Sequence, residues 1–273
     1  MYKNLNAESL GISARQHELI ELALTYKFRG IDLDIESLMK QVELHGAEHA
    51  TRYLTSANVR IGGFELPARW DAEDAIYQED LQRLTQIAEV AASLGAVGCT
   101  TTVLPYSDGR AYHENFEFHR SRLTEIAEVL QNHGIRLGLG FKAPTESREG
   151  YDSPFIATPE ALLTLIKTIV SPNVGLCLDL WHWHVGGGTL DQMKDLTVDR
   201  IVSVRLADAP TEVSPPDITE EQRLLPGSTG VVPADIALRW LAEQRYRGPV
   251  TAYCHPAQFT GITRTHAVEQ AAQ

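Results

Sequence analysis

The feature that most constrains the fold is a regular alternation of short apolar runs with amphipathic stretches along the chain. Each run is bounded by Gly, Pro or Asn, as buried strands are. Seven runs are explicit, at residues 28–35, 58–67, 96–105, 135–144, 173–181, 200–210 and 248–256, and the weaker stretch 2–12 could supply an eighth. Strictly alternating β and α units in one chain predict a parallel sheet.

The stretches between these runs have helical spacing and helical end signals. One begins with Thr158 and Pro159, a typical N-cap and first helical residue, and another ends at the glycine cap Gly134. The predicted helices cover residues 72–95, 116–134, 158–173 and 232–248.

Eight such units in 273 residues predict an α/β fold, a (β/α)8 TIM barrel that forms a single domain over residues 1–273. The alternative is a doubly wound open sheet, which usually has a Gly-rich phosphate loop after its first strand, and the sequence shows none. The one long loop expected is 211–230, and loops of this kind at the C-terminal face of a barrel often cover the active site.

Composition excludes several partners. The net charge of -12 argues against nucleic acid, which requires clustered Lys and Arg. No apolar run approaches the ~18 residues that span a bilayer, and the N-terminus has no apolar leader, so no membrane partner is expected. Cys99, Cys177 and Cys254 are far apart and lie in apolar stretches, typical of buried thiols in a reducing compartment. We expect a cytoplasmic location.

Strand alternation predicts which side chains face the barrel interior. In the run 174–179 the leucines should pack on the helices, which leaves Cys177 and Asp179 facing inward. The same rule places Val202 outward and Asp32 inward. It predicts a polar ring at the C-terminal mouth that consists of Asp34, Glu65, Lys142, Asp179, Arg205, Tyr253 and His255, with His182 and His184 just beyond. Taken alone, each of these residues is best interpreted as an ordinary hydrogen-bonded polar group of the interior. Their convergence at this end of the barrel favours an active or ligand-binding site.

Four stretches of sequence resemble a known family. They read "GIRLGLGFKAPTESREGYDSPFI", "NVGLCLDLWHWHVGGGT", "DRIVSVRLADAP" and "RLLPGSTGVV". They resemble the sugar phosphate isomerase/epimerase family, which has a xylose-isomerase-like TIM barrel and includes inosose isomerases and dehydratases. The resemblance runs from "FRGIDLD" to "YRGPV". It implies a divalent metal (Mn, Mg, Co or Zn) that polarises a carbonyl while a proton moves through an enediol.

The same resemblance implies four metal ligands: a Glu, the Asp of an Asp-x-x-His motif, a His and a second Glu. The matching positions hold Gly140, Asp179, Arg205 and Tyr253, so one ligand type of four is retained. A permanent cation at a ligand position repels a metal, and no cofactor is therefore expected. A site rebuilt from Asp179 and the three histidines of the mouth remains an alternative.

We hypothesise that Arg205 takes the place of the metal and pairs with Asp179. The substitution has two interpretations that the sequence does not separate. Arg205 either only neutralises a leftover buried carboxylate, or binds an anionic or carbonyl-bearing ligand together with Lys142.

The function predicted first is that of an isomerase/epimerase-like enzyme or lyase. It would act on a polyhydroxylated keto compound (a sugar, cyclitol or glycoside) through an enolate, without metal. Arg205 and Lys142 would stabilise the oxyanion, His182 or His255 would carry protons with Tyr253 as a relay, and Asp34, Glu65, Trp181, His184 and Asp208 would contact the ligand. The expected partner is a small carbohydrate-like ligand, and nothing in the sequence identifies an interface for a homo-oligomer.

Two other functions compete with this one. A non-catalytic barrel that serves as a binding or scaffold subunit would explain the lost ligands, although the retained polar mouth favours an altered enzyme. A DNA-repair endonuclease of the same superfold would need a multi-metal cluster and a basic face, against the net charge of -12.

Overall fold

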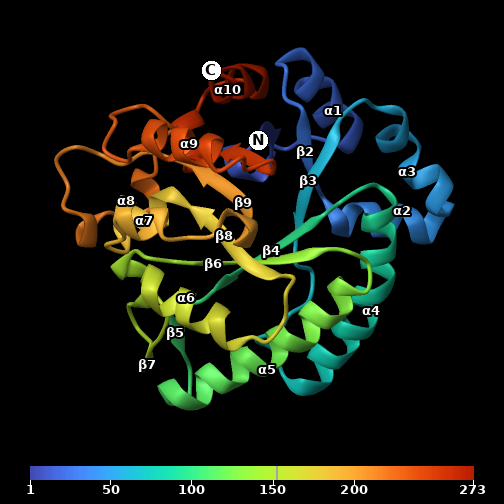
Figure 1. Cartoon of the computed structure of the whole chain (residues 1–273). Coiled ribbons are helices and arrows are strands. Elements are labelled where there is room, and N and C mark those ends of the chain that lie inside the picture. Colours follow the sequence, from blue (N-terminus) through green and yellow to red (C-terminus); the bar gives the residue numbers. More distant parts are fainter. Residues whose placement is uncertain (152) are drawn as a thin grey trace.

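A computed structural model of the chain, describing residues 1–151 and 153–273, is a closed barrel of parallel strands surrounded by helices (Figure 1). The predicted (β/α)8 architecture is confirmed. Around the barrel the strands follow the order β1-β10-β9-β8-β6-β4-β3-β2. Their bounds are β1 Tyr2–Leu5, β2 Gly30–Leu33, β3 Arg60–Glu65, β4 Gly98–Val103, β6 Arg136–Phe141, β8 Val174–Asp179, β9 Ile201–Leu206 and β10 Pro249–Ala252. A separate antiparallel pair is formed by β5 (Tyr106–Ser107) and β7 (Ser153–Pro154).

The four predicted helices are present, although their ends are shifted. The structure also contains helices that the sequence did not predict. The helices are α1 Gln16–Thr25, α2 Ile35–His45, α3 Ala47–Ser56, α4 Asp74–Ser93, α5 Tyr112–Gln131, α6 Pro159–Thr168, α7 Leu180–Val185, α8 Leu190–Lys194, α9 Ala234–Glu243 and α10 Arg264–Ala271. Helix α5 begins earlier than the predicted residue 116. Its N-cap, Ala111, has no capping side chain, so the sequence carries no signal for that start. Within the described ranges, no helix is both long and apolar enough to cross a membrane.

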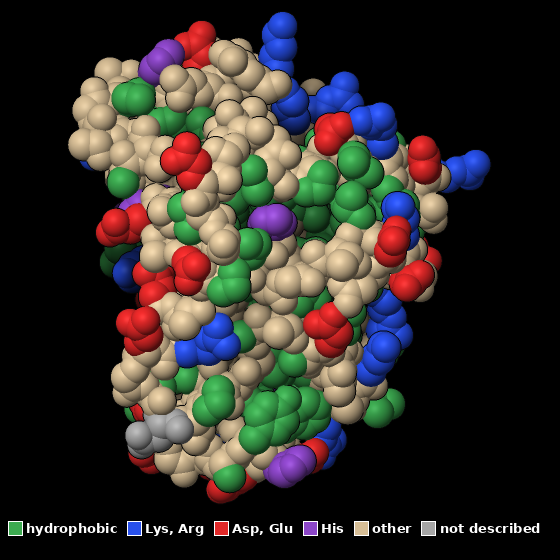
Figure 2. All heavy atoms as spheres, turned by 90° about the vertical axis from the view of Figure 1, so that its left-hand side faces the viewer, with side chains coloured by type: hydrophobic (Ala, Val, Ile, Leu, Met, Phe, Trp, Pro, Cys, Tyr) green, Lys and Arg blue, Asp and Glu red, His purple; other side chains and the backbone are tan. Residues whose placement is uncertain are grey.

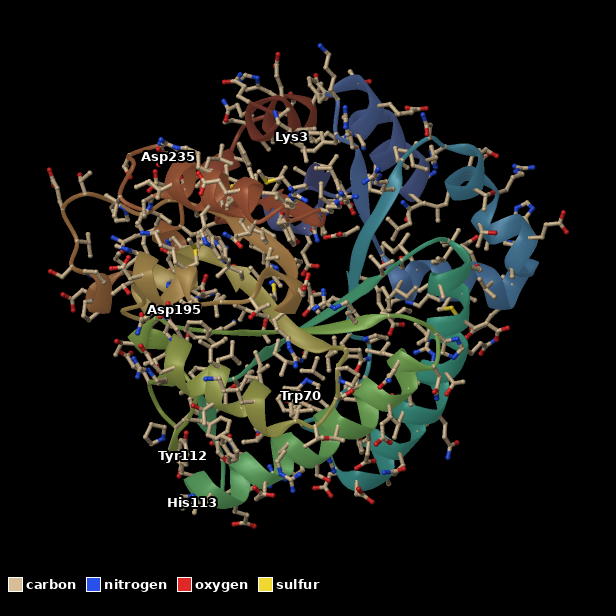
Figure 3. The ribbon with its side chains drawn as sticks, in the orientation of Figure 1. Lys3, Trp70, Tyr112, His113, Asp195 and Asp235 are labelled. Carbon is tan, nitrogen blue, oxygen red and sulfur yellow. The ribbon has the colours of Figure 1, made fainter. Side chains whose placement is uncertain are left out.

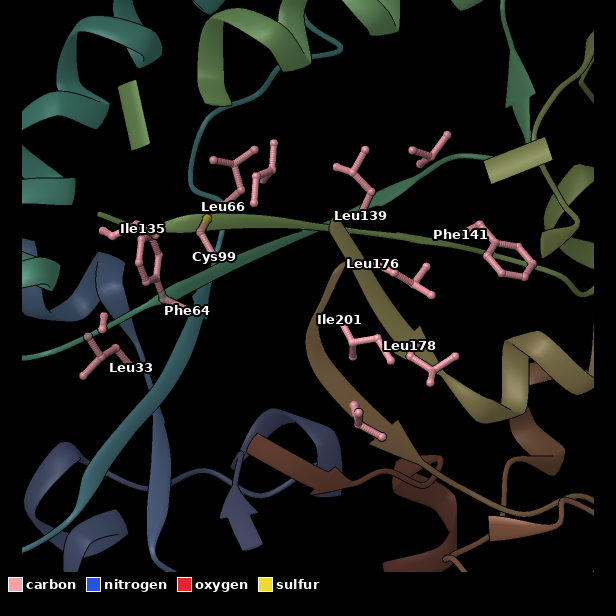
Figure 4. Packing of buried hydrophobic residues seen from close by; sticks show 14 of the residues in the cluster. Leu33, Phe64, Leu66, Cys99, Ile135, Leu139, Phe141, Leu176, Leu178 and Ile201 are labelled. Atoms are coloured by element: carbon pink, nitrogen blue, oxygen red, sulfur yellow. The ribbon is translucent and has the colours of Figure 1, made fainter. Parts of the chain in front are cut away.

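The main apolar layer lies between the strands and the helices. Leu139, Leu176 and Leu178 are at most 2% exposed and belong to the hydrophobic core, consistent with their predicted outward orientation from the strands. Figure 4 shows part of this layer, including residues from β2 to β9. The three cysteines are buried and unpaired.

The inner face of the barrel is lined by small residues that leave room for polar side chains. A Cβ at Gly62 would lie 2.2 Å from Oδ1 of Asn4, so the Asn4 side chain depends on this glycine. Asn4 Nδ2 in turn donates to Asp32 Oδ1 (2.8 Å) and to Thr251 Oγ1 (3.0 Å). The space that remains inside is a cavity of about 20 Å³, which has room for one water molecule.

Strand alternation fails at one point of the inner face. Val202 was expected to face outward, but it lines this inner cavity together with its neighbour Ser203. The register of β8 and β9 shifts there, with Leu176 opposite Ile201 and Cys177 opposite Ser203. A bulge of this kind breaks the two-residue period, which explains why two adjacent side chains reach the same space.

Two inward glycines are expected to respond differently to alanine. A Cβ at Gly175 would lie 2.2 Å from the backbone oxygen of Arg200, whereas a Cβ at Gly140 would have its nearest neighbour at 3.7 Å. We expect Gly175→Ala to lower the free energy of unfolding by about 1–3 kcal/mol and Gly140→Ala to change it by less than about 1 kcal/mol. Urea denaturation of the two variants measures the difference, and equal losses would contradict it.

Candidate active site at the barrel mouth

A buried ion pair occupies the C-terminal mouth. Asp179 ends β8 and caps α7, with Oδ1 accepting from the backbone N–H groups of Trp181 (3.1 Å) and His182 (3.3 Å). Its Oδ2 accepts from Nη2 of Arg223 at 2.6 Å, and the two side chains are 6% and 8% exposed. Burial acts to raise the pKa of Asp179, but the charges of Arg223 and its other neighbours outweigh it and leave that pKa lowered. The carboxylate is therefore fully engaged.

The predicted pairing of Arg205 with Asp179 is wrong. The two residues are neighbours in the register of β8 and β9, but Nη2 of Arg205 donates to Glu65 Oε2 (3.2 Å) and to Thr100 Oγ1 (3.1 Å). The guanidinium reaches across the barrel to β3 and β4, while Arg223 enters from the long segment after β9 and takes the aspartate.

Tyr253 links the two guanidinium groups. It follows β10, and its ring centroid lies 4.9 Å from the Cζ atoms of both Arg205 and Arg223. Contacts of this kind are favourable cation–π interactions. Burial raises the pKa of the Tyr253 phenol, so its hydroxyl stays protonated at neutral pH. The mouth thus contains two fixed cations around one aromatic ring.

His182 lies beside this ion pair on the first turn of α7. Its Nδ1 accepts from the backbone N–H of Ala143 (3.3 Å), and its Nε2 lies 3.7 Å from Oε1 of Glu220. Burial lowers the pKa of His182 to about 3, with the positive charges of Arg223 and Lys142 adding to the effect. The imidazole is therefore neutral at physiological pH, and the contact at Nδ1 places its proton on Nε2.

The segment that supplies Arg223 was expected only as a covering loop. It contains the short 3-10 helix η5 (Glu220–Gln222), which begins with a capping box between Thr219 and Gln222. The backbone N–H of Glu220 donates to Oε1 of Glu146 at 2.7 Å, which ties the segment to the loop after β6. Sequence reasoning missed both Glu220 and Arg223, because no periodic pattern assigns a direction to loop side chains.

Asp208, predicted to contact the ligand, organises the same segment instead. It is 0% exposed, and its two oxygens accept from the backbone N–H groups of Ala209, Thr229, Gly230 and Val232 at 2.7–3.0 Å. Its backbone pairs with that of Leu224, next to Arg223. Asp208 thus fixes the chain just after Glu220 and Arg223, the two residues of the segment that enter the mouth.

Of the two aspartates predicted to face inward at β2, one does so and the other does not. Asp32 faces inward as expected, with Asn6 Nδ2 donating to its Oδ2 at 2.8 Å. The inward prediction for Asp34 is wrong, because β2 ends at Leu33 and the chain turns into α2. Asp34 is exposed and caps that helix by accepting from the backbone N–H of Ser37 at 3.0 Å.

The predicted histidines do not converge. His184 lies on a different side of α7 from the ion pair and lines an apolar cavity of about 260 Å³ with Trp183 and Met193. Figure 2 shows the face that carries α7 and α8, on which hydrophobic side chains are spread among charged ones. His255 caps the 3-10 helix η6 (Pro256–Phe259), its Nδ1 accepting from the N–H of Ala257 at 3.3 Å.

Trp181 and Lys142 complete the set of predicted residues. Trp181 is 0% exposed and lies beneath the Arg223 guanidinium, 5.2 Å from Cζ to the ring centroid, so it does not form an open wall. Lys142 follows β6 and is half-buried. No hydrogen bond or ion pair of its ammonium is found in the described part of the chain, and its charge acts on His182 and Glu220.

The four positions implied by the family do not fit a divalent metal. Of Gly140, Asp179, Arg205 and Tyr253, only the aspartate is one of the metal ligands that the family implies. Its Oδ2 already accepts a hydrogen bond from the Arg223 guanidinium. Across residues 1–151 and 153–273, no group of three or more His, Cys, Asp or Glu side chains is placed to bind a metal. Oxygen-preferring cations require several such donors.

The comparisons with known proteins agree with this architecture. The family model described as "Xylose isomerase-like TIM barrel" matches residues 20–272. The chain belongs to this family. An inosose isomerase from Bacillus subtilis (strain 168) is 26% identical over 150 residues, 55% of this chain and 50% of that protein, so the match spans about half the length of this curated relative.

Two solved structures share the whole barrel. A xylose isomerase domain protein from Alicyclobacillus acidocaldarius superposes with a TM-score of 0.88 at 25% identity, covering 99% of this chain and 95% of that one. An IolI protein with a bound zinc atom superposes with a TM-score of 0.81 at 19% identity and the same coverage. The comparisons therefore establish the family of the chain and its barrel fold.

Proposed function

We propose that this protein isomerises or epimerises a polyhydroxylated keto compound through an enolate, with guanidinium groups in place of the divalent metal. The observation that carries the proposal is the pair of guanidinium groups at the barrel mouth, Arg205 and Arg223, which both contact the ring of Tyr253. The inosose isomerase relatives suggest a cyclic polyol ketone as the substrate class.

The charges of the mouth suit an enolate. When a proton leaves the carbon next to a carbonyl, the negative charge moves to the carbonyl oxygen. Fixed hydrogen-bond donors in a water-poor site stabilise such an oxyanion. Arg205 has donors beyond the Nη2 that binds Glu65, and Lys142 lies near the same cluster. Burial lowers the pKa of His182 to about 3, so its imidazole is not a strong base.

The proposal predicts reaction without metal. The protein is expected to exchange the proton next to the carbonyl of inosose for deuterium in heavy water after treatment with a chelator. Elemental mass spectrometry should find less than about 0.1 equivalent of Mn, Zn, Co or Mg, because a single engaged carboxylate cannot retain such ions. Proton NMR follows the exchange. A stoichiometric metal that Asp179→Ala removes, and whose loss stops the exchange, would overturn the proposal.

Two variants separate the role of Arg205 from general charge effects. Arg205→Met should lower the exchange rate by about 100-fold or more, because removing one oxyanion donor has an effect of this order. Arg239→Met removes an exposed cation of α9 and should leave the rate unchanged. Binding of inosose without any exchange, lost in Arg205→Met, would favour a non-catalytic barrel that serves as a binding subunit.

A further inference from the structure

One buried carboxylate oxygen in the mouth has no hydrogen-bond donor. Oε1 of Glu220 is inaccessible to water and has no hydrogen-bond partner among the residues the structure describes. Leaving a buried acceptor unpaired costs free energy, so such an arrangement calls for an explanation. The side chain as a whole is 30% exposed, so its accessible part lies away from Oε1. The second oxygen, Oε2, is not one of the buried unpaired atoms, and we take it as the oxygen that meets a ligand.

The nearest donor to this oxygen is His182. Its Nε2 lies 3.7 Å from Oε1, slightly beyond hydrogen-bond distance. Because Nδ1 accepts from the N–H of Ala143, the single proton of the neutral ring is on Nε2 and faces the carboxylate. Contacts of this type are commonly long without ligand and shorten in the reactive complex. The imidazole is thus placed to orient the carboxylate.

Glu220 reaches this position on the same short turn that brings Arg223 to Asp179. The turn is fixed by its capping box and by the contact of its first backbone N–H with Glu146. Residues 220–223 therefore bring the Glu220 carboxylate next to His182 and the Arg223 guanidinium next to Asp179.

The charges around Glu220 also suit a proton carrier. Burial raises the pKa of Glu220, and Asp179 and Glu146 add to this, while Arg223 and Lys142 act in the opposite direction. A carboxylate with a raised pKa is a stronger base than an ordinary one and better matched to neutral pH.

We propose that Glu220 carries the proton in this active site and that His182 is the positioning residue that holds it. Oε2 takes the proton from the carbon next to the carbonyl, and the C–H electron pair forms a C=C bond while the carbonyl oxygen becomes an oxyanion beside the guanidinium groups. The neighbouring hydroxyl gives its proton to that oxyanion. Glu220 then returns its proton to the former carbonyl carbon, which completes an isomerisation without any co-reactant.

This inference rests on the proposed function, and deuterium exchange tests it. In heavy water, Glu220→Gln should slow the exchange of inosose by about 100-fold or more, since a general base contributes about that much. Its affinity for inosose, measured by calorimetry, should change less than about threefold because the amide keeps the size of the side chain. The matched control is Glu221→Gln, the next residue on the turn, which is exposed and should exchange like the wild type.

A second variant tests the positioning role of His182. Without this N–H, the Glu220 carboxylate has no donor that can close on it in the reactive complex, so its pKa there rises further. His182→Phe should therefore move the acid limb of the exchange rate to higher pH, a shift that simple loss of folded protein would not produce.

The possible outcomes separate the two proposals. Exchange by the wild type that persists in Glu220→Gln would overturn the role of Glu220 and leave the proposed function standing. No exchange by the wild type with inosose or with an open-chain ketose such as fructose would overturn the proposed function itself.

Discussion

Replacing Arg223 with methionine is expected to lower the free energy of unfolding by about 3–5 kcal/mol. The variant would leave Asp179 buried with its Oδ2 unpaired, and removing one partner of a buried pair strands the other charge. Urea denaturation near pH 7 measures the change. The control is Arg239→Met, whose partner Asp235 lies on the outer helix α9 (Figure 3). Both side chains of that pair are about 70% exposed, and the loss should stay below about 0.5 kcal/mol.

A double-mutant cycle identifies which arginine holds the aspartate. Asp179→Leu combined with Arg223→Met should be far more stable than the sum of the single losses implies, because the two charges are removed together. Asp179→Leu combined with Arg205→Met should show a much smaller coupling energy, since Arg205 bonds to Glu65 and Thr100. A larger coupling with Arg205 would contradict the ion pair described here.

The ion pair also connects stability to the proposed chemistry. The family resemblance implies a metal cation beside Asp179, and in this chain the Arg223 guanidinium pairs with that aspartate. The cation thereby becomes a fixed part of the fold rather than an exchangeable ion. An enzyme built in this way should retain its stability in chelator, whereas a metal-dependent fold would lose some.

The sequence predicts the barrel well because strand and helix periods are local properties. The runs that form β3, β4, β6, β8 and β9 contain a hydrophobic alternation, and this alternation matches the inner and outer faces of the barrel. Predictions of side-chain direction succeeded within strands, as for Asp32 in β2 and Asp179 in β8. They failed where the period is interrupted, at the bulge beside Val202 and beyond the end of β2 at Asp34.

The candidate site was only partly predictable for a related reason. Asp179, His182 and Arg205 lie on or next to strands, so their positions follow from the fold. Arg223 and Glu220 lie in the 211–230 loop, and the direction of their side chains depends on contacts with distant residues. The anchoring of that loop by Asp208 is a tertiary feature with no local signal.

A second large effect is expected from His119, buried on α5 outside the barrel mouth. Its Nδ1 contacts the backbone oxygen of Asn115 at 2.7 Å, and its Nε2 is buried without a partner in the part of the chain that the structure describes. The ring packs between Trp70 and Phe155, at centroid distances of 4.7 and 4.6 Å. Burial lowers the pKa of His119 to about 4. The folded protein therefore keeps this imidazole neutral where an unfolded chain would protonate it.

The sign of the pH effect follows from this difference. Between the ordinary histidine pKa near 6.5 and about 4, the unfolded chain binds one more proton at this position than the folded chain. Stability must therefore fall as the pH is lowered through this window. At about 1.4 kcal/mol for each unit of pKa shift, the loss from near pH 7 to near pH 4.5 amounts to about 2 kcal/mol.

His119→Phe should remove that part of the acid sensitivity while it keeps the aromatic packing. Urea midpoints near pH 7 and near pH 4.5 should then differ by about 2 kcal/mol less in the variant than in the wild type. The control is His113→Gln, an exposed histidine near the start of the same helix (Figure 3), which should leave the pH dependence unchanged. If His119→Phe retained the full acid sensitivity, the loss would have to arise from other buried groups, with His182 the first to examine because its pKa is lowered further still.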